Sequence, residues 1–154
     1  MMIPLVAFYS QTGTTQTVAR ALAQGLAADT EQIISNLSNK GRPRLAMQAL
    51  LRIHAKIGNI TKDPALYDLV LIGTPIWAQN MSSPVRTYLA RNKNKFTRVA
   101  FFCTYGGSGS DKVLKQMESL CGKKPVGVLD VLAKDVQSGD YVQKVNQFIS
   151  ELQR

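Results

Sequence analysis

The chain has 154 residues, 45% of them hydrophobic and 19% charged, which predicts one globular domain over residues 1–154 and excludes a disordered or multidomain chain. Nineteen basic and 10 acidic side chains leave a net charge of +9, which favours anionic partners without naming their class. No apolar run is long enough to cross a membrane and MMIPLVAFYS lacks the pattern of a signal peptide, so we expect a cytoplasmic protein without a transmembrane segment.

The N-terminal part of the chain predicts a strand, a polar loop, a helix and a second strand. IPLVAFY at 3–9 is typical of a buried strand, and the polar stretch SQTGTT follows it directly. Val18, Leu22 and Leu26 then recur at helical spacing, as they do in a helix with one buried face. EQIIS at 31–35 is a weaker strand pattern.

The segment 36–68 is long and basic. It contains LAMQALLRIHAKIG, which predicts a helix with one apolar side formed by Leu45, Leu50, Ile53 and Ile57. Between 40 and 62 no acidic residue offsets the basic ones, which are Lys40, Arg42, Arg44, Arg52, Lys56 and Lys62. A second basic run, RNKNKFTR, follows at 91–98. We therefore expect two basic faces.

The rest of the chain continues to alternate strands with helices. Three more apolar runs predict strands: LVLIG at 69–73, VAFFC at 99–103 and VGVLDVL at 126–132. Ser83 and Pro84 are typical of the N-cap and first residue of a helix that buries Val85 and Leu89. The last helix is marked by Val142, Val145, Ile149 and Leu152. Five such units predict an α/β fold with a doubly wound parallel sheet, whose ligands bind at the carboxyl ends of the strands.

The stretch SQTGTT lies where the first strand passes into the first helix. Helix N-termini present free amides and a positive dipole end, and hydroxyls can donate to the same anion. Gly13 permits a tight turn, and the absence of a GK[ST] sequence distinguishes this loop from a Walker A motif. The stretch favours a phosphate held by uncharged donors, although a hydroxyl-rich capped turn has the same pattern.

Two aromatic residues lie in later loops at the same predicted edge. Trp77, the only tryptophan, follows the third strand in TPIWAQNMSSP, and Tyr105 opens the loop TYGGSGS. An indole and a phenol in these positions are suited to cover the faces of one planar ring. Trp77 could equally cap the core, and YGGSG is also common in flexible turns.

Taken together, the three loops resemble those of the flavodoxin family over nearly the whole chain. The resemblance implies a short-chain flavodoxin with a five-stranded parallel sheet of order 2-1-3-4-5 and FMN as cofactor. It assigns the FMN phosphate to the first loop, residues Ser10, Gln11, Thr12, Gly13, Thr14 and Thr15. It assigns the isoalloxazine to the other two loops, residues Thr74, Pro75, Ile76, Trp77, Ala78, Thr104, Tyr105, Gly106, Gly107, Ser108 and Gly109.

The resemblance implies a low-potential electron carrier between redox proteins, with no catalytic side chain. The alternative is an FMN-dependent NAD(P)H:quinone oxidoreductase, which would need one face of the flavin open. Typical members of the family are acidic, whereas this chain is basic. We therefore expect redox partners with acidic docking faces, and a raised potential for the second reduction step if the basic faces lie near the cofactor.

The remaining reactive residues are interpreted as structural. His54 lies in a basic stretch and is expected to be a solvated surface residue, while Cys103 and Cys121 are expected to be reduced thiols without metal-binding spacing. Cys103 has apolar neighbours typical of a core position. The chain lacks a phosphatase C-x₅-R loop, a G-x-G-x-x-G after a strand, the acidic sites of a receiver domain and any recognisable nucleic-acid motif.

Overall fold

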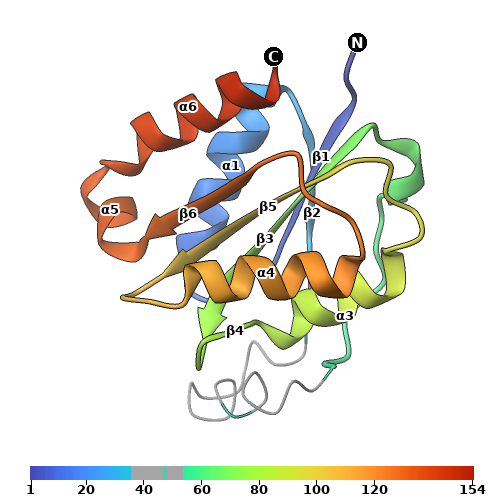
Figure 1. Cartoon of the computed structure of the whole chain (residues 1–154), viewed down its shortest axis with the longest axis horizontal. Coiled ribbons are helices and arrows are strands. Elements are labelled where there is room, and N and C mark those ends of the chain that lie inside the picture. The colour runs from blue at the N-terminus through green and yellow to red at the C-terminus, as the bar shows by residue number, and fades with distance from the viewer. Residues whose placement is uncertain (36–46, 48–53) are drawn as a thin grey trace.

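The protein has three layers, with helices on both faces of a central sheet (Figure 1). The structure is a computed structural model that describes residues 1–35, 47 and 54–154. One face of the sheet carries the helices α1 (Thr14–Leu26) and α6 (Tyr141–Leu152), and the other carries α3 (Ser83–Asn92) and α4 (Ser110–Cys121). Within the described residues, no helix combines the length and the apolar character needed to span a bilayer.

The sheet confirms the predicted doubly wound class. Its parallel strands lie in the order β2-β1-β3-β5-β6, so the chain reverses its winding direction after β2. These strands are β1 (Pro4–Phe8), β2 (Asp29–Gln32), β3 (Leu69–Trp77), β5 (Val99–Tyr105) and β6 (Val128–Leu132). The order agrees with the expected 2-1-3-4-5 once the parallel strands alone are numbered. A short strand, β4 (Asn80–Met81), is added to it and pairs antiparallel with the end of β3.

The bounds of all the predicted strands differ from the observed ones: β1 and β6 are shorter than predicted, β5 continues to Tyr105 into the predicted third loop, and β3 and β2 differ most. β3 continues past Gly73 to Trp77, where we had predicted a loop, because Thr74 and Pro75 pair with Cys103 and Thr104 of β5. β2 ends at Gln32 rather than Ser35, because β1, its partner, ends opposite Gln32 at Phe8.

The two faces of the sheet form separate apolar clusters. Leu22 of α1 and Phe148 of α6 pack with Val6 of β1 on one face. Val85 of α3 and Met117 of α4 pack on the other face. The predicted stripes Val18/Leu22/Leu26 and Val85/Leu89 are all buried, as expected of helices that cover a sheet.

Two helix predictions were wrong in detail. The N-cap of α3 is Ser82 rather than Ser83, because Ser82 has an extended backbone while Ser83 is already helical. Val142, in the first turn of α6, is 45% exposed, and Phe148 is buried in the stripe instead. The helix α5 (Ala133–Ser138) directly precedes α6 (Figure 1). Most of the predicted helix around 45–57 lies outside the described residues; at its end, Ile57 forms an isolated antiparallel bridge with Ser35.

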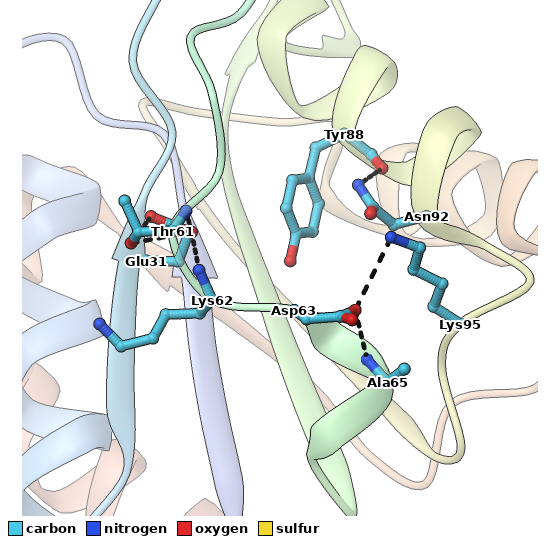
Figure 2. Close-up of polar contacts among 8 residues, drawn as sticks. All are labelled: Glu31, Thr61, Lys62, Asp63, Ala65, Tyr88, Asn92 and Lys95. Carbon is cyan, nitrogen blue, oxygen red and sulfur yellow. Dashed lines mark hydrogen bonds and ion pairs between the residues drawn. The ribbon is translucent and has the colours of Figure 1, made fainter.

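A buried carboxylate anchors the chain where it returns toward the sheet after this segment. Glu31 of β2 is 6% exposed, and its Oε1 accepts hydrogen bonds from Thr61 N at 2.6 Å and Lys62 N at 2.8 Å (Figure 2). Next to it, Asp63 accepts a bond from Ala65 N and pairs with Lys95 Nζ at 3.7 Å. Charge-assisted bonds to backbone amides are the stronger kind, so Glu31 fixes the entry into β3.

Candidate functional site

A pocket of about 580 Å³ opens at the carboxyl end of the parallel strands, where this class of fold binds its ligands. Four segments meet there: the loop after β1, the end of β3, the end of β5 and the helix α5. The lining residues are Ser10, Gln11, Thr12, Thr14, Thr15, Pro75, Ile76, Trp77, Ala78, Thr104, Tyr105, Gly106, Ala133 and Gln137.

The structure brings together the three loops that the sequence singled out. Twelve of the predicted site residues line this pocket. Among the described residues, those predicted for the site but placed outside its wall are Gly13, Thr74, Gly107, Ser108 and Gly109. Gly13 and Gly109 instead have positive φ values of 97° and 101° and form the N-caps of α1 and α4. A left-handed conformation at these positions favours glycine.

The first loop ends in the N-terminus of α1 with its polar groups toward the pocket. The N-cap residue Gly13 has no side chain to occupy the first amides of the helix, and its own N–H donates to Ser10 Oγ at 3.1 Å. Thr14 and Thr15 begin the helix and line the pocket. The arrangement therefore offers backbone amides and hydroxyls at one place, the donor set that binds phosphate groups.

Thr74 has a structural role. It is fully buried, and its hydroxyl lies 2.8 Å from Pro75 O and 2.9 Å from Ser82 Oγ, while Ser82 N donates back to it at 3.0 Å. These contacts join the end of β3 to the start of α3. Thr74 thus supports the wall of the pocket from behind.

Trp77 is held by packing on the side away from the pocket. Its ring meets the buried ring of Tyr9 edge-on, with centroids 5.6 Å apart and planes at 86°. Ala55, from the segment that leads into β3, packs against the same indole, and Thr87 of α3 donates a hydrogen bond to Ala55 O. Trp77 is therefore both a wall residue and a cap on the core, which joins the two readings of the sequence.

A tight hairpin follows Trp77 and turns at Ala78 and Gln79. Both residues have positive φ, 48° and 63°. Positive φ at both central residues is typical of a two-residue type I′ hairpin turn, whose twist matches that of the flanking strands. Asn80 is 2% exposed and donates to Ala78 O at 2.8 Å, while its own Oδ1 accepts from Gln116 Nε2 at 2.6 Å. Gln116 Oε1 also accepts from Met81 N. Side-chain bonds thus hold a turn that non-glycine residues adopt at a cost.

The hairpin is also joined to the third loop. Gln79 Nε2 donates to Ser108 Oγ at 3.0 Å. A Cβ at Gly109 would lie only 2.7 Å from Gln79 Oε1, so the loop must pass close to this side chain. Ser108 and Gly109 therefore contribute to the site by positioning the hairpin.

Sequence reasoning missed the fourth side of the pocket. Ala133 and Gln137 belong to α5, which begins directly after β6. The elements predicted from the sequence included no helix between the last strand and the last helix. Gly139, with φ of 91°, ends α5, and a glycine after a short polar stretch was the signal that could have revealed a separate helix.

The pocket is electrically neutral in its own lining. Among the described residues, no side chain that lines it carries a charge. The basic run 91–98 spans the end of α3 and its connection to β5, at the amino end of β5 and therefore opposite the pocket. The seven residues of β5 separate its two ends by roughly 20 Å. Because charges are screened over about 8 Å in physiological salt, this run has little influence on the pocket.

The two cysteines and the histidine lie where a structural role predicts. Cys103 is fully buried, and burial raises the pKa of its thiol to about 12. Cys121 is 3% exposed, and its pKa is also raised by burial. His54 is exposed. The cysteines are therefore core residues, as expected for Cys103.

Fold and pocket together define a doubly wound α/β protein with a pocket at the switch point of its sheet, lined by groups suited to an anionic ligand. The flavodoxin family matches residues 3–145, and the chain belongs to this family. Solved structures share the fold. A flavoprotein from Lactobacillus acidophilus, solved in complex with FMN, is 22% identical, with a TM-score of 0.77 over 92% of this chain and 99% of that one.

More distant structures share the same fold. The flavodoxin of Megasphaera elsdenii, solved in its two-electron reduced form, is 17% identical with a TM-score of 0.60, and 97% of each chain is covered. A flavodoxin, WrbA-like protein from Agrobacterium tumefaciens is 14% identical with a TM-score of 0.56, covering 98% of this chain and 99% of that one.

Proposed function

We propose that the protein binds FMN in this pocket and acts as a low-potential electron carrier between redox proteins. The observation that carries the proposal is the division of the pocket into two chemically distinct parts. Amides and hydroxyls of the first loop and α1 form one part, and Trp77, Ile76 and Tyr105 form the other. FMN has the same two parts, a phosphate and a planar tricyclic ring, and an FMN-bound flavoprotein shares the fold.

The residues present fit that cofactor. Ser10, Thr12 and Thr14 would hold the phosphate together with the first amides of α1. Trp77 and Tyr105 would cover the ring system and exclude water from it, as predicted from the sequence. When bound, FMN supplies the capacity to accept and release electrons one or two at a time. No side chain needs to exchange a proton with a substrate in this proposal.

The two cysteines and the net charge also suit a cytoplasmic protein that exchanges electrons with protein partners. Both cysteines are buried free thiols outside the pocket lining, as expected in a reducing compartment. The net charge of +9 favours redox partners with acidic docking faces.

The test is flavin binding by the purified protein, with riboflavin as the comparison ligand. The holoprotein is expected to show the two visible absorption bands of flavin. In fluorescence-quenching titrations, the apoprotein is expected to bind FMN much more tightly than riboflavin. Thr14→Val is expected to weaken FMN binding by about tenfold or more, because a hydrogen bond to a charged group is lost, and to leave riboflavin binding nearly unchanged. Thr97→Val, at an exposed position before β5, is the matched control.

A colourless protein that does not quench FMN fluorescence would contradict the proposal. Steady-state assays then separate the carrier from the alternative reductase. A carrier is expected to show negligible NAD(P)H oxidation with a quinone, whereas rapid turnover would establish the NAD(P)H:quinone oxidoreductase instead.

A further inference from the structure

Tyr105 of the pocket wall is hydrogen-bonded to a carboxylate on the neighbouring strand. In the parallel pairing of β5 and β6, Cys103 lies opposite Asp130. Residues two apart on a strand share a face, so Tyr105 and Asp130 project to the same side of the sheet. The Tyr105 hydroxyl donates to Asp130 Oδ2 at 2.9 Å.

The other carboxylate oxygen has a partner of its own. Lys144 of α6 lies with its Nζ 3.3 Å from Asp130 Oδ1. Burial tends to raise the pKa of Asp130, but the hydrogen bond from Tyr105 and the charge of Lys144 outweigh it, so the pKa lies below its usual value. Asp130 is therefore ionised at neutral pH and remains a hydrogen-bond acceptor.

The two residues directly after Tyr105 do not hold its phenol ring, although the Ser110 hydroxyl at the start of α4 hydrogen-bonds with the phenol and with Asp130. Gly106 and Gly107 follow it directly, and a Cβ built at either position would meet nothing within 4 Å. Tyr105 itself is only partly buried. A side chain at such a position samples more than one rotamer unless its far end is attached. The bond to Asp130 supplies that attachment.

We propose that Asp130, which lies outside the pocket wall, is a positioning residue that orients the ring of Tyr105 for the bound flavin. The proposal rests on the proposed function for its ligand. The carboxylate commits the Tyr105 hydroxyl to β6, so that the ring rather than the hydroxyl is presented to the ligand. Preorganisation of this kind improves affinity because the ring has less freedom to lose on binding.

The test compares three variants by FMN binding. Asp130→Ala removes the acceptor and is expected to raise the FMN Kd about three- to tenfold, as the loss of one hydrogen bond does. Asp130→Asn keeps an acceptor oxygen and is expected to restore the Kd to within about twofold of the wild type. Tyr105→Phe keeps the ring but not the hydroxyl, and should match Asp130→Ala.

The double variant Asp130→Ala/Tyr105→Phe decides whether the two residues act together. If Asp130 acts through Tyr105, the double variant binds FMN no more weakly than either single variant. Multiplicative effects, or an Asp130→Ala protein that binds as tightly as the wild type, would overturn the proposal. Asp135→Asn is the charge-matched control, because Asp135 belongs to α5 of the pocket but has no bond to Tyr105 among the described contacts.

A measurement on the apoprotein separates this proposal from the function on which it rests. NMR of the apoprotein labelled with ¹³C-tyrosine reports the motion of the ring, and the Tyr105 signals are those that disappear in Tyr105→Phe. The ring is expected to be more mobile in Asp130→Ala and to behave as in the wild type in Asp130→Asn. Unchanged ring motion would overturn the positioning role even if FMN binds. A wild-type protein that does not bind FMN would overturn the proposed function, while the ring measurement still decides whether Asp130 orients Tyr105.

Discussion

Thr15 Oγ1 lies 2.8 Å from Thr104 Oγ1, which joins the first helix to the end of β5 across 89 residues of sequence. Both side chains are almost fully buried, at 1% and 3% exposure, and both line the pocket. The two hydroxyls thus hold together two walls of the pocket that the sequence keeps far apart.

Loss of one of these hydroxyls should destabilise the protein more than loss of both. Thr104→Val leaves Thr15 with a buried hydroxyl and no partner, and is expected to lower the free energy of unfolding by about 1–3 kcal/mol. In Thr15→Val/Thr104→Val the pair is replaced by methyl groups of the same shape, and most of the loss should be recovered. Urea denaturation of the apoprotein measures both. A double variant whose loss of stability equals the sum of the two single losses would refute a direct coupling.

The hairpin at the pocket mouth should depend on Asn80. Asn80→Ala removes the donor to Ala78 O and the acceptor of Gln116, and is expected to lower the free energy of unfolding by about 1–3 kcal/mol. The variant should also weaken FMN binding, because the left-handed turn at Ala78 loses its support. Asn94→Ala, at an exposed position, is the matched control and should stay within about 0.5 kcal/mol of the wild type. Denaturation and fluorescence titration together check this prediction, and an unchanged FMN affinity would contradict it.

Close packing between β3 and the neighbouring strand β5 should make Gly73 irreplaceable. A Cβ at Gly73 would clash with the ring of Phe102, which is fully buried and cannot move aside. Gly73→Ala is therefore expected to cost about 2–3 kcal/mol of stability or more.

Gly25→Ala is the control for this prediction. Its Cβ would come too close only to the terminal methyl of Ile149, which can rotate away, and alanine favours a helix by about 1 kcal/mol over glycine. We expect the free energy of unfolding of Gly25→Ala to lie within about 1 kcal/mol of the wild-type value, as measured by thermal denaturation. Equal losses for the two variants would show that the clash at Gly73 is not the cause.

The native thiols should not react with alkylating or disulfide reagents at pH 8. Cys103 is fully buried with a pKa of about 12, and Cys121 is 3% exposed with a raised pKa. Only the thiolate reacts, so both access and ionisation are lacking. Titration with a chromogenic disulfide is expected to find almost no thiol in the native protein and two in urea. Fast labelling of the native protein would disprove the buried placement.

Stability should fall as pH rises above about 9. The ordinary pKa of a cysteine thiol is 9.0, whereas in the folded protein burial raises that of Cys103 to about 12. Between these values the unfolded chain releases a proton that the native state keeps, so unfolding becomes easier with increasing pH. The stabilisation is complete below pH 9 and is lost as pH rises toward 12. Urea midpoints from pH 8 to pH 11 measure the slope, and Cys103→Ser should reduce it.

Much of the fold could be predicted because each central strand is an almost unbroken apolar run. Strands buried on both faces require such runs, and Leu5, Ile72 and Phe101 are indeed fully buried. The end of β3 was not predictable in this way, because Pro75 is typical of a loop. It belongs to a strand here because β1 ends opposite Gly73, so no neighbour on that side needs its missing N–H.

The candidate site was predictable to the extent that its residues lie at strand ends. Ser10 follows β1, while Trp77 and Tyr105 are the last residues of β3 and β5, and the carboxyl ends of parallel strands lie together. The charge around the pocket was not predictable, since the run 91–98 is close to Tyr105 in sequence but lies at the other end of β5. Screening over that distance removes the effect on flavin potential that the sequence suggested for this run.

The sequence by itself determined the class of fold and three of the segments that form the pocket, because burial period and turn chemistry are local properties of the chain. The order of the strands came from the resemblance to flavodoxins. Only the tertiary structure decided which side chains face the ligand and which support them. Thr74, Asn80 and Asp130 acquire their roles from partners on other elements. Such hydrogen bonds depend on strand register and helix placement, which no local pattern specifies.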